Sequence, residues 1–294
     1  MTKTVLAVGN MEVAHDKVTN LEGIENLLVE AAGGGAELLV LPEACLQGYA
    51  DFEPPVGSKE EVEQKRYFLS QAETIPGPST ERIERLCAER KIYIQFGLIE
   101  RDRWGDHLYN SVAMVGPHGV IGTYSKTHNQ FEFPYFCAGS RFSVVDLPFG
   151  RVGSAICYDL AFPEVPRILA LSGAEMIAMS TSWPMKGRDR AFDYHGWAMD
   201  TSAASAAFAN HVWVLVSNQC TQDAYNGKLD YYGHSQIVAP DGLTRAAVQW
   251  DPGLVMSEVD IREEIRASKT ERFFGLNMLQ DRRPEIYGDL SARG

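Results

Sequence analysis

The stretch "SAICYDLAFPE", residues 154–164, places one cysteine where a buried strand ends and a helix begins. Its first three residues have the small and apolar character of a strand's end, and Pro163 suits the first turn of a helix that continues to Leu171. Cys157 then lies in the turn between them, where a thiol can project into a cleft beside the free N–H groups of a helix start. Most free cysteines are simply small buried apolar residues, so the rest of the chain has to decide between packing and catalysis.

Short β-type runs alternate with amphipathic helical patterns along the whole chain. The predicted helices cover about 21–31, 79–87, 162–172 and 190–210, the second with Ser79 or Thr80 as its N-cap. The predicted strands are "TVLAVGN" (4–10), "ELLVLP" (37–42), "IYIQFGLIE" (92–100), "AEMIAMST" (174–181), "VWVLVSN" (212–218) and runs near 233–239 and 253–259, with hairpins that turn at 117–119 and 148–150. Many strands with few long helices favour an α/β fold of sheets packed face to face with helices outside.

The composition is that of an ordinary globular protein, with 294 residues, 45% hydrophobic and 22% charged. No linker, repeat or low-complexity tract divides the chain, so we expect a single domain over residues 1–294, with a polar C-terminal arm from about residue 262 that wraps the body or a partner subunit. A net charge of -12 without a basic cluster argues against nucleic acid and membrane surfaces as partners. The N-terminus has no signal-peptide pattern and no apolar run reaches membrane-spanning length, so we expect a cytoplasmic protein.

The cysteines suggest neither a disulfide framework nor a zinc site. Their number is odd, they are widely spaced, and no C-x-x-C pair or histidine lies at metal-site spacing. The five are Cys45, Cys87, Cys137, Cys157 and Cys220. The chain also lacks G-x-S-x-G, H-E-x-x-H, a Walker loop and G-x-G-x-x-G, which leaves a thiol enzyme without metal or cofactor as the open possibility.

Two charged residues share the context of the cysteine. Glu43 follows Pro42 at the end of a predicted buried strand, and Lys126 closes the strand "VIGTYSK" in the same way. Either one alone is more simply a solvated charge, because charged side chains are mostly exposed. Since ligands of α/β proteins bind at the carboxyl ends of strands, the three positions together favour a site.

Three blocks of this sequence closely resemble the catalytic blocks of the nitrilase superfamily, the carbon-nitrogen hydrolases. They are "LPEACLQGY" (41–49), "GTYSKTH" (122–128) and "SAICYDLAFPE", and they are accompanied by the family-like "GHSQIVAPDG" (233–242) and "RRPEIY" (282–287). The resemblance implies a four-layer αββα sandwich, paired into a homodimer or higher homo-oligomer through helices that follow the lysine and cysteine blocks. It also implies a catalytic triad of Glu43, Lys126 and Cys157.

The implied roles suit the chemistry of these residues. A carboxylate in a pocket that excludes water has a raised pKa and can take the thiol proton, so Glu43 is the expected base. Lys126 and the backbone N–H of Tyr158 are expected to stabilise the oxyanion. The family often carries a second glutamate that positions substrate and lysine, and "NQFEFPYFCAGS" (129–140) offers Glu132, one residue nearer the lysine than usual. His128 is expected to bond to neighbouring backbone and receives no catalytic step.

The residues after the cysteine favour an amidase. Relatives of the amidase type read C-Y-D-x-R-F, whereas this chain reads "CYDLAF", with Ala161 where the arginine stands. Because that arginine would be the natural partner of a substrate carboxylate, its absence argues against ω-amido acids. Aromatic side chains would instead line an apolar pocket, although each could equally be core packing. These are Tyr49, Phe131, Phe133, Tyr135 and Trp183, with Tyr158 beside the nucleophile.

The sequence therefore favours hydrolysis of a neutral aliphatic or aromatic amide to a carboxylic acid and ammonia through a thioester. A nitrilase or an N-carbamoyl amide hydrolase could use the same triad. A non-catalytic binding protein on this fold would be expected to lose a triad member, and all three are present. A glutaminase subunit is disfavoured because no synthetase domain is attached and the arginine is missing.

Overall fold

The computed structural model describes residues 3–49, 54–104, 107–129, 135–185, 189–222 and 230–291. The strands are β1 (Thr4–Glu12), β2 (Leu38–Val40), β3 (Tyr93–Arg101), β4 (Leu108–Gly116), β5 (Gly119–Ser125), β6 (Ser143–Leu147), β7 (Gly150–Ile156), β8 (Met176–Thr181), β9 (Pro184–Met185), β10 (Trp213–Gln222), β11 (Asp230–Tyr232), β12 (Gln236–Val238), β13 (Thr244–Ala247) and β14 (Gly253–Val259). The α-helices are α1 (Lys17–Gly33), α2 (Lys59–Gln71), α3 (Pro78–Arg90), α4 (Glu164–Leu171), α5 (Tyr194–Asn210) and α6 (Ile261–Thr270). Short 3₁₀ turns follow β7 and α6.

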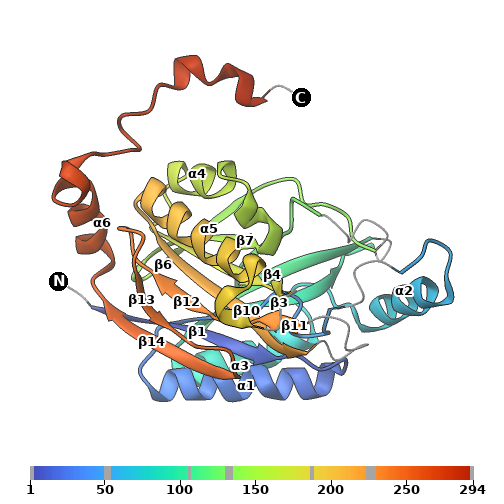
Figure 1. The fold of residues 1–294 in the computed structure, drawn as a ribbon. Helices are drawn as coiled ribbons and strands as arrows, with labels where there is room; N and C mark the ends of the chain where they lie inside the picture. Colours follow the sequence, from blue (N-terminus) through green and yellow to red (C-terminus); the bar gives the residue numbers. More distant parts are fainter. Residues whose placement is uncertain are drawn as a thin grey trace.

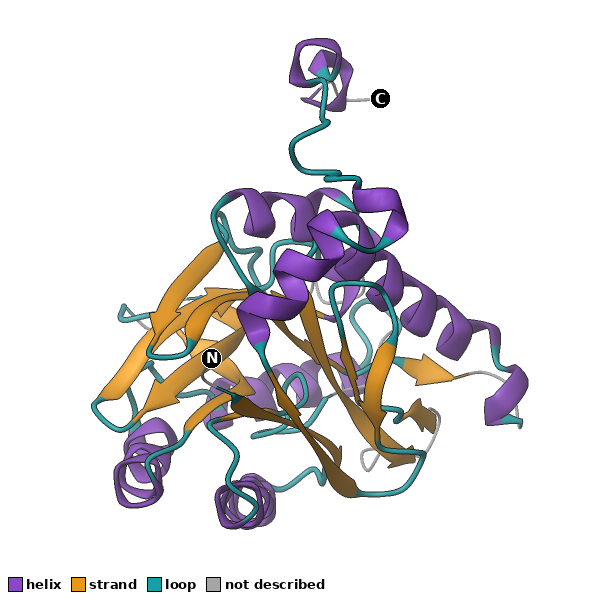
Figure 2. Cartoon of the chain, turned by 90° about the vertical axis from the view of Figure 1, so that its left-hand side faces the viewer, coloured by secondary structure: helices purple, strands orange, loops and turns teal. Residues whose placement is uncertain are grey.

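The strands form two sheets that meet along one seam. The first has the order β5-β4-β3-β2-β1 with β14 added to β1, and the second has the order β6-β7-β8-β10 with β12 added to β10 and β13 added to β12. The seam is a short parallel pairing of β1 with β10, in which Met11 lies opposite Gln219. Helices α1 and α3 cover the first sheet, and α4 and α5 cover the second, as Figures 1 and 2 show. This arrangement confirms the predicted four-layer αββα sandwich.

Alternation along the strands builds the three cores between these layers, because successive side chains of a strand point to opposite faces. In β1, Ala7 packs under α1, whereas Leu6 and Val8 point between the sheets. In β8, Ile177 packs under the second helical layer, whereas Ala178 points between the sheets. These strands are buried on both faces, which explains why their sequences are nearly continuous apolar runs.

A polar cluster interrupts the apolar layer between the sheets. The Gln95 side chain of β3 donates to the Ala178 carbonyl at 3.0 Å and to the Ser180 hydroxyl at 3.1 Å, both on β8. Its amide oxygen accepts from Ser154 of β7 at 2.7 Å, and Ser180 donates to the Leu41 carbonyl at 2.7 Å. Because each of these buried groups is paired, the contacts fix how the two sheets lie relative to each other.

Several boundaries differ from those predicted. Helix α3 has Gly77 as its N-cap and Pro78 at its first position, so Ser79 and Thr80 lie inside the helix. Thr80 still caps this terminus, because its hydroxyl accepts from the Gly77 N–H at 2.8 Å. Helix α2 escaped prediction because only Gln64 and Phe68 are buried, which leaves no apolar periodicity to detect.

The region after β14 is partly helical rather than a simple arm. Residues 261–270 form α6, whose N-cap Asp260 accepts from the Glu263 N–H at 3.0 Å. Beyond it, residues 271–291 project past the end of the second helical layer with only 3₁₀ turns (Figures 1 and 2). Several large apolar side chains there are exposed, among them Phe274 (93%), Ile286 (64%) and Leu290 (68%). Within the described part of the chain, no helix is both long and apolar enough to cross a membrane.

Candidate active site

The three residues of the expected triad lie at the carboxyl ends of strands from both sheets. Glu43 follows β2, Lys126 follows β5, and Cys157 follows β7. The structure thus brings together residues that are widely separated in sequence, at the edge where α/β proteins bind ligands.

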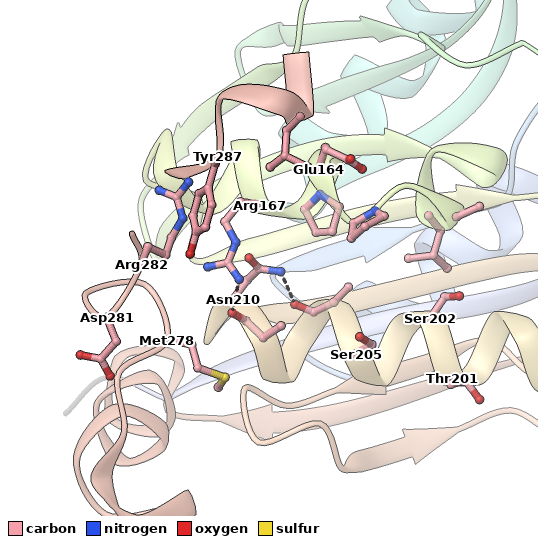
Figure 3. Close-up of a pocket in the computed structure, with 17 residues that line it drawn as sticks. Glu164, Arg167, Thr201, Ser202, Ser205, Asn210, Met278, Asp281, Arg282 and Tyr287 are labelled. Atoms are coloured by element: carbon pink, nitrogen blue, oxygen red, sulfur yellow. Dashed lines mark hydrogen bonds between the residues drawn. The ribbon is translucent and has the colours of Figure 1, made fainter. Parts of the chain in front are cut away.

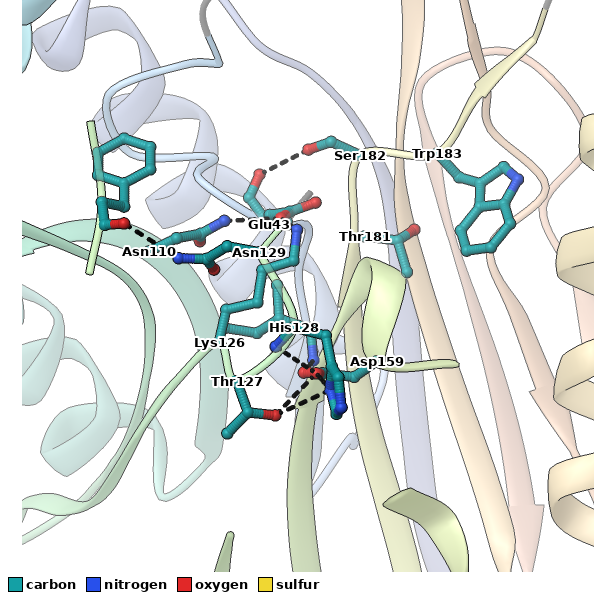
Figure 4. A network of polar contacts seen from close by, with 12 residues as sticks. Glu43, Asn110, Lys126, Thr127, His128, Asn129, Asp159, Thr181, Ser182 and Trp183 are labelled. Atoms are coloured by element: carbon teal, nitrogen blue, oxygen red, sulfur yellow. Dashed lines mark hydrogen bonds and ion pairs between the residues drawn. The ribbon is translucent and has the colours of Figure 1, made fainter. Parts of the chain in front are cut away.

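Glu43 and Lys126 form a buried ion pair. The Lys126 Nζ donates to Glu43 Oε1 at 2.8 Å, and the two side chains are 4% and 1% exposed. Asn110 Nδ2 of β4 donates to the same oxygen at 2.7 Å (Figure 4). Buried charges persist only when they are paired and hydrogen-bonded, so these donors stabilise the ionised carboxylate.

The backbone of Glu43 is held by the opposite sheet. Its carbonyl accepts from the Ser182 hydroxyl at 3.1 Å (Figure 4). It also accepts from Gln219 Nε2 of β10 at 3.0 Å, and Gln219 donates to Ser182 at 2.8 Å. The Glu43 N–H donates to the Thr181 carbonyl at 3.3 Å. The carboxylate is therefore held by donors of the first sheet, whereas the Glu43 backbone is also held by the second sheet.

The chain next to Glu43 has unusual backbone geometry. Ala44 has a φ of 47°, in the left-handed region that side chains other than glycine rarely adopt. Gly97 of β3 passes so close that a Cβ there would lie 2.3 Å from the Ala44 nitrogen and 2.5 Å from the Pro42 carbonyl oxygen. Backbone conformations of this kind persist only when the surroundings hold them, and they cluster at functional sites.

Cys157 also has left-handed backbone geometry, with a φ of 46° at the start of the 3₁₀ turn Cys157–Ala161. The residue as a whole is half-buried. Burial raises the pKa of the Cys157 thiol well above its usual range, and the charge of Glu43 raises it further, while Lys126 and a hydrogen bond from the backbone of Ser182 lower it. At neutral pH this sulfur is protonated and needs a base before it can attack.

His128 does not pair with backbone as the sequence suggested. Its Nδ1 lies 2.7 Å from Asp159 Oδ1, and its ring stacks on Phe162 with the centroids 3.9 Å apart (Figure 4). The partner is the carboxylate of Asp159, two residues beyond the cysteine. The sequence immediately around His128 could not reveal this contact, because Asp159 lies far along the chain.

Among the predicted substrate-binding residues, two share one aromatic cluster. Tyr49 and Tyr135 pack with Phe68 and Phe136, and the cluster continues to Ala44 beside Glu43. Glu132, Phe131 and Phe133 lie outside the described residues.

Trp183 and Tyr158 lie beside the triad segments in different ways. The Trp183 indole N–H donates to the His195 carbonyl of α5 at 2.8 Å, and its ring packs against the core under α4 and α5, pointing away from Lys126 (Figure 4). Tyr158 follows the cysteine, and its ring meets Phe162 edge to face. A direct contact of either side chain with substrate stays a prediction.

Comparison with known proteins identifies the family. The family model described as carbon-nitrogen hydrolase matches residues 5–269. The chain belongs to the carbon-nitrogen hydrolase family.

Relatives in this family have several named activities. The chain is 30% identical to the omega-amidase NIT2 of Homo sapiens, covering 90% of this chain and 92% of that protein. It is 32% identical to a protein named nitrilase from Pyrococcus abyssi, covering 91% and 92%. A variant of the amidase from Nesterenkonia sp. AN1 in complex with butyramide superposes with a TM-score of 0.75 at 20% identity, covering 97% of this chain and 95% of that chain, so this likeness concerns the fold.

Three residues of this carbon-nitrogen hydrolase site escaped the sequence analysis, namely Asn110, Asp159 and Gln219. Asn110 and Gln219 lie inside ordinary strand patterns, and only the folded sheets bring them to Glu43. Asp159 stands in the cysteine block, yet its partners come from the lysine block. Across the described residues, no group of three His, Cys, Asp or Glu side chains is arranged to hold a metal ion.

A cavity of about 650 Å³ lies beside this site, between α4, α5 and the C-terminal segment (Figure 3). Leu160 and Ala161 of the cysteine's turn reach it, together with Arg167, Arg282 and Tyr287. None of the triad side chains lines it. Position 161, where related amidases carry arginine, is therefore placed on this cavity.

Proposed function

We propose that this chain hydrolyses linear amides through a thioester on Cys157. The observation that carries the proposal is the 2.8 Å contact between Lys126 and Glu43, whose charge also raises the pKa of the Cys157 thiol. A base, an oxyanion partner and a nucleophile are thereby within reach of one reacting carbon.

The reaction follows from these positions. Glu43 takes the proton of the Cys157 thiol, and the sulfur attacks the amide carbon. Lys126 and the backbone N–H of Tyr158 stabilise the oxyanion that forms. As the tetrahedral intermediate collapses, the C–N bond breaks, the protonated Glu43 gives its proton to the nitrogen, and ammonia leaves. Glu43 then deprotonates a water molecule, which attacks the thioester. The C–S bond breaks, the protonated Glu43 returns its proton to the Cys157 sulfur, and the carboxylic acid leaves.

The raised thiol pKa supports a base-assisted attack. A resting thiolate would react without Glu43, whereas a protonated thiol depends on it at the moment of attack. An interaction speeds the reaction only if it is stronger in the transition state than in the resting enzyme. The oxyanion is a charge that exists only transiently, so Lys126 is suited to stabilise it.

For the substrate we propose a neutral amide. Ala161 stands where the resemblance to related amidases implies an arginine, and the aromatic cluster of Tyr49 and Tyr135 includes Ala44, the residue after Glu43. A substrate carboxylate would be desolvated there, and Lys126, which already pairs with Glu43, would give it little compensation. The amidase from Nesterenkonia sp. AN1 captured with butyramide gives one example of a neutral amide on this fold.

A matched pair of substrates tests this specificity. We expect a higher kcat/KM for butyramide than for succinamate, and equal values or a preference for the acid would contradict the proposal. Ala161→Arg then shows whether position 161 reaches the acyl group. A smaller ratio of kcat/KM for butyramide to kcat/KM for succinamate would show that it does. An unchanged ratio would limit position 161 to the cavity beside α4 and α5.

The reaction itself is tested by trapping the acyl-enzyme. A panel of amides, nitriles and N-carbamoyl compounds is mixed with the protein, and the mass of the covalent adduct and the released products are measured. We expect acid and ammonia from amides, with Cys157→Ala abolishing the adduct and Cys137→Ala, at the other partly exposed cysteine, retaining it. Preferred turnover of nitriles would favour the activity named for the Pyrococcus abyssi relative, and amine with carbon dioxide would favour a carbamoyl hydrolase.

We also propose a homodimer built on the second helical layer. Exposed apolar side chains occur on α4, on α5 and on the projecting C-terminal segment. They include Ile168, Leu171, Trp197, Ile286 and Leu290. Of the two helices that the family resemblance implies for the dimer, α4 follows the cysteine block, and the described residues between Lys126 and β6 contain no helix. A cytoplasmic location stays a prediction.

A further inference from the structure

We propose that Asp159 is a positioning residue that sets the geometry between the cysteine and the lysine. The inference rests on the proposed function, because it concerns how the two groups are held for the reaction. Asp159 is fully buried and accepts hydrogen bonds from both segments that carry them.

On the cysteine side, Asp159 stabilises the strained turn. The Ile156 N–H donates to Asp159 Oδ2 at 3.0 Å, so the carboxylate closes a loop around Cys157. A residue with a φ of 46° needs such support, because the left-handed conformation is unfavourable for a side chain with a Cβ. The bond therefore fixes the direction in which the thiol points.

On the lysine side, Asp159 binds residues on both flanks of Lys126. The Tyr124 hydroxyl donates to Oδ2 at 2.7 Å, and the Thr127 hydroxyl donates to Oδ1 at 3.0 Å. The His128 N–H donates to Oδ1 at 3.2 Å, and His128 Nδ1 lies 2.7 Å from the same oxygen (Figure 4). One carboxylate thus joins the end of β5 to the start of the turn after β7.

The hydrogen-bond donors around Asp159 require a charged acceptor. The carboxylate oxygens meet hydrogen-bond donors from both segments, and an ionised carboxylate accepts at both oxygens. Burial raises the pKa of the Tyr124 hydroxyl, and the charge of Asp159 raises it further, so this hydroxyl stays protonated and continues to donate. An asparagine of the same shape would present an NH₂ group to some of these donors and loosen the junction.

The chain offers a matched control in Asp200. Asp200 accepts from Tyr232 at 3.1 Å and from Gln236 at 2.6 Å, and lies 2.9 Å from His234 Nδ1. Like Asp159, Asp200 therefore contacts one histidine and one tyrosine, but none of its partners lies in a segment that carries a triad residue. Loss of Asp200 reports what a merely structural Asp–His–Tyr contact contributes.

The test compares Asp159→Asn with Asp200→Asn at equal folded fraction, measured by circular dichroism and thermal unfolding. Since misplacement of reacting groups by about 1 Å can cost about 100-fold, we expect kcat of Asp159→Asn to fall by about that factor. KM should change by less than about 3-fold, because the loss is confined to the transition state. Asp200→Asn should keep the wild-type kcat. An equal kcat in both variants, or a change in KM alone, would overturn the inference.

Two further measurements keep the outcomes distinct. If Asp159→Asn does not fold, Tyr124→Phe removes one donor and retains the carboxylate, and it should lower kcat by about 3- to 10-fold with KM unchanged, as expected for a smaller misplacement; an unchanged kcat contradicts the role. The acyl-enzyme of the unmodified protein is measured first. Its absence with every amide defeats the proposed function, whereas its presence with an unchanged rate in Asp159→Asn defeats only the role of Asp159.

Discussion

The candidate site buries charged side chains, whereas the C-terminal segment exposes apolar ones, so both regions differ from an ordinary folded protein but in opposite ways. In the site, Glu43, Lys126 and Asp159 are charged side chains that are almost completely buried. In the segment after α6, Phe274 and Leu290 are apolar side chains that are mostly exposed. Each departure costs free energy in an isolated chain, since buried charges lose hydration and exposed apolar surface orders water.

The two regions differ in how that cost is offset. The buried charges are compensated inside the chain, by the contacts from Lys126 and Asn110 to Glu43 and by the donors around Asp159. The apolar surface of the segment projects from the body, which is why a second copy is the proposed occupant. We therefore expect substitutions in the first region to change the chemistry and substitutions in the second to change the assembly.

The largest effect is expected for Glu43→Gln. The amide keeps the shape and removes the base, so kcat should fall at least ~100-fold. The charge of Glu43 raises the pKa of the Cys157 thiol, so its removal lowers that pKa and increases the thiolate fraction at a given pH. Iodoacetamide should therefore label Cys157 as fast as in the unmodified protein or faster, and the pH profile of labelling should shift to lower pH.

Glu258→Gln is the control for this change, because Glu258 forms only an exposed ion pair with Lys3. Both its turnover and its labelling should match those of the unmodified protein. A parallel loss of turnover and labelling in Glu43→Gln would show that the glutamate supports the local structure rather than acting as the base.

An intermediate effect is expected for Gly97→Ala. The added Cβ would overlap the backbone next to Glu43, so the turn after β2 has to shift. Overpacking of this kind typically costs about 1–3 kcal/mol of unfolding free energy, and we expect kcat to fall as well because the carboxylate moves.

Gly33→Ala at the end of α1 is the control for Gly97→Ala. The unfolding free energy of both variants is measured by chemical denaturation, and their kcat is measured by enzyme kinetics. Nothing lies within 4 Å of a Cβ at that position, and alanine in a helix is favoured over glycine by about 0.5–1 kcal/mol. Its stability should be unchanged or higher. If Gly97→Ala had the same unfolding free energy and the same kcat as the unmodified protein, the contact between β3 and the turn that carries Glu43 would not be restrictive.

The smallest effect on catalysis is expected in the C-terminal segment. Ile286→Ser with Leu290→Ser removes exposed apolar surface without touching the triad, so kcat should stay within about 2-fold while self-association weakens. Analytical ultracentrifugation over a concentration series measures the change. The same substitution at Val18, which is 62% exposed on α1 in the opposite layer, should leave association unaltered. Unchanged association in the double variant would exclude these side chains from the contact.

Sequence patterns predicted the layers well because period-two alternation and apolar runs report burial directly. Glu43, Lys126 and Cys157 could be predicted as a triad because each follows a strand and lies in a block that resembles a family pattern, and their catalytic roles stay predictions. Asn110 and Gln219 could not, since their importance arises from register and from packing between sheets, which no local pattern encodes. The partner of His128 was missed for the same reason, because Asp159 is 31 residues away.

The hydrogen bond from Gln219 to the Glu43 carbonyl joins positions 176 residues apart. Contacts of such sequence separation form late, because loop closure has to precede them. A chain emerging from the ribosome has Glu43, Lys126 and Cys157 long before β10 exists, and its glutamate then lacks the partner that holds it. Under the proposed mechanism, the cysteine gains its base only when the two sheets close, and an incompletely synthesised or partly folded chain would carry no premature hydrolytic activity.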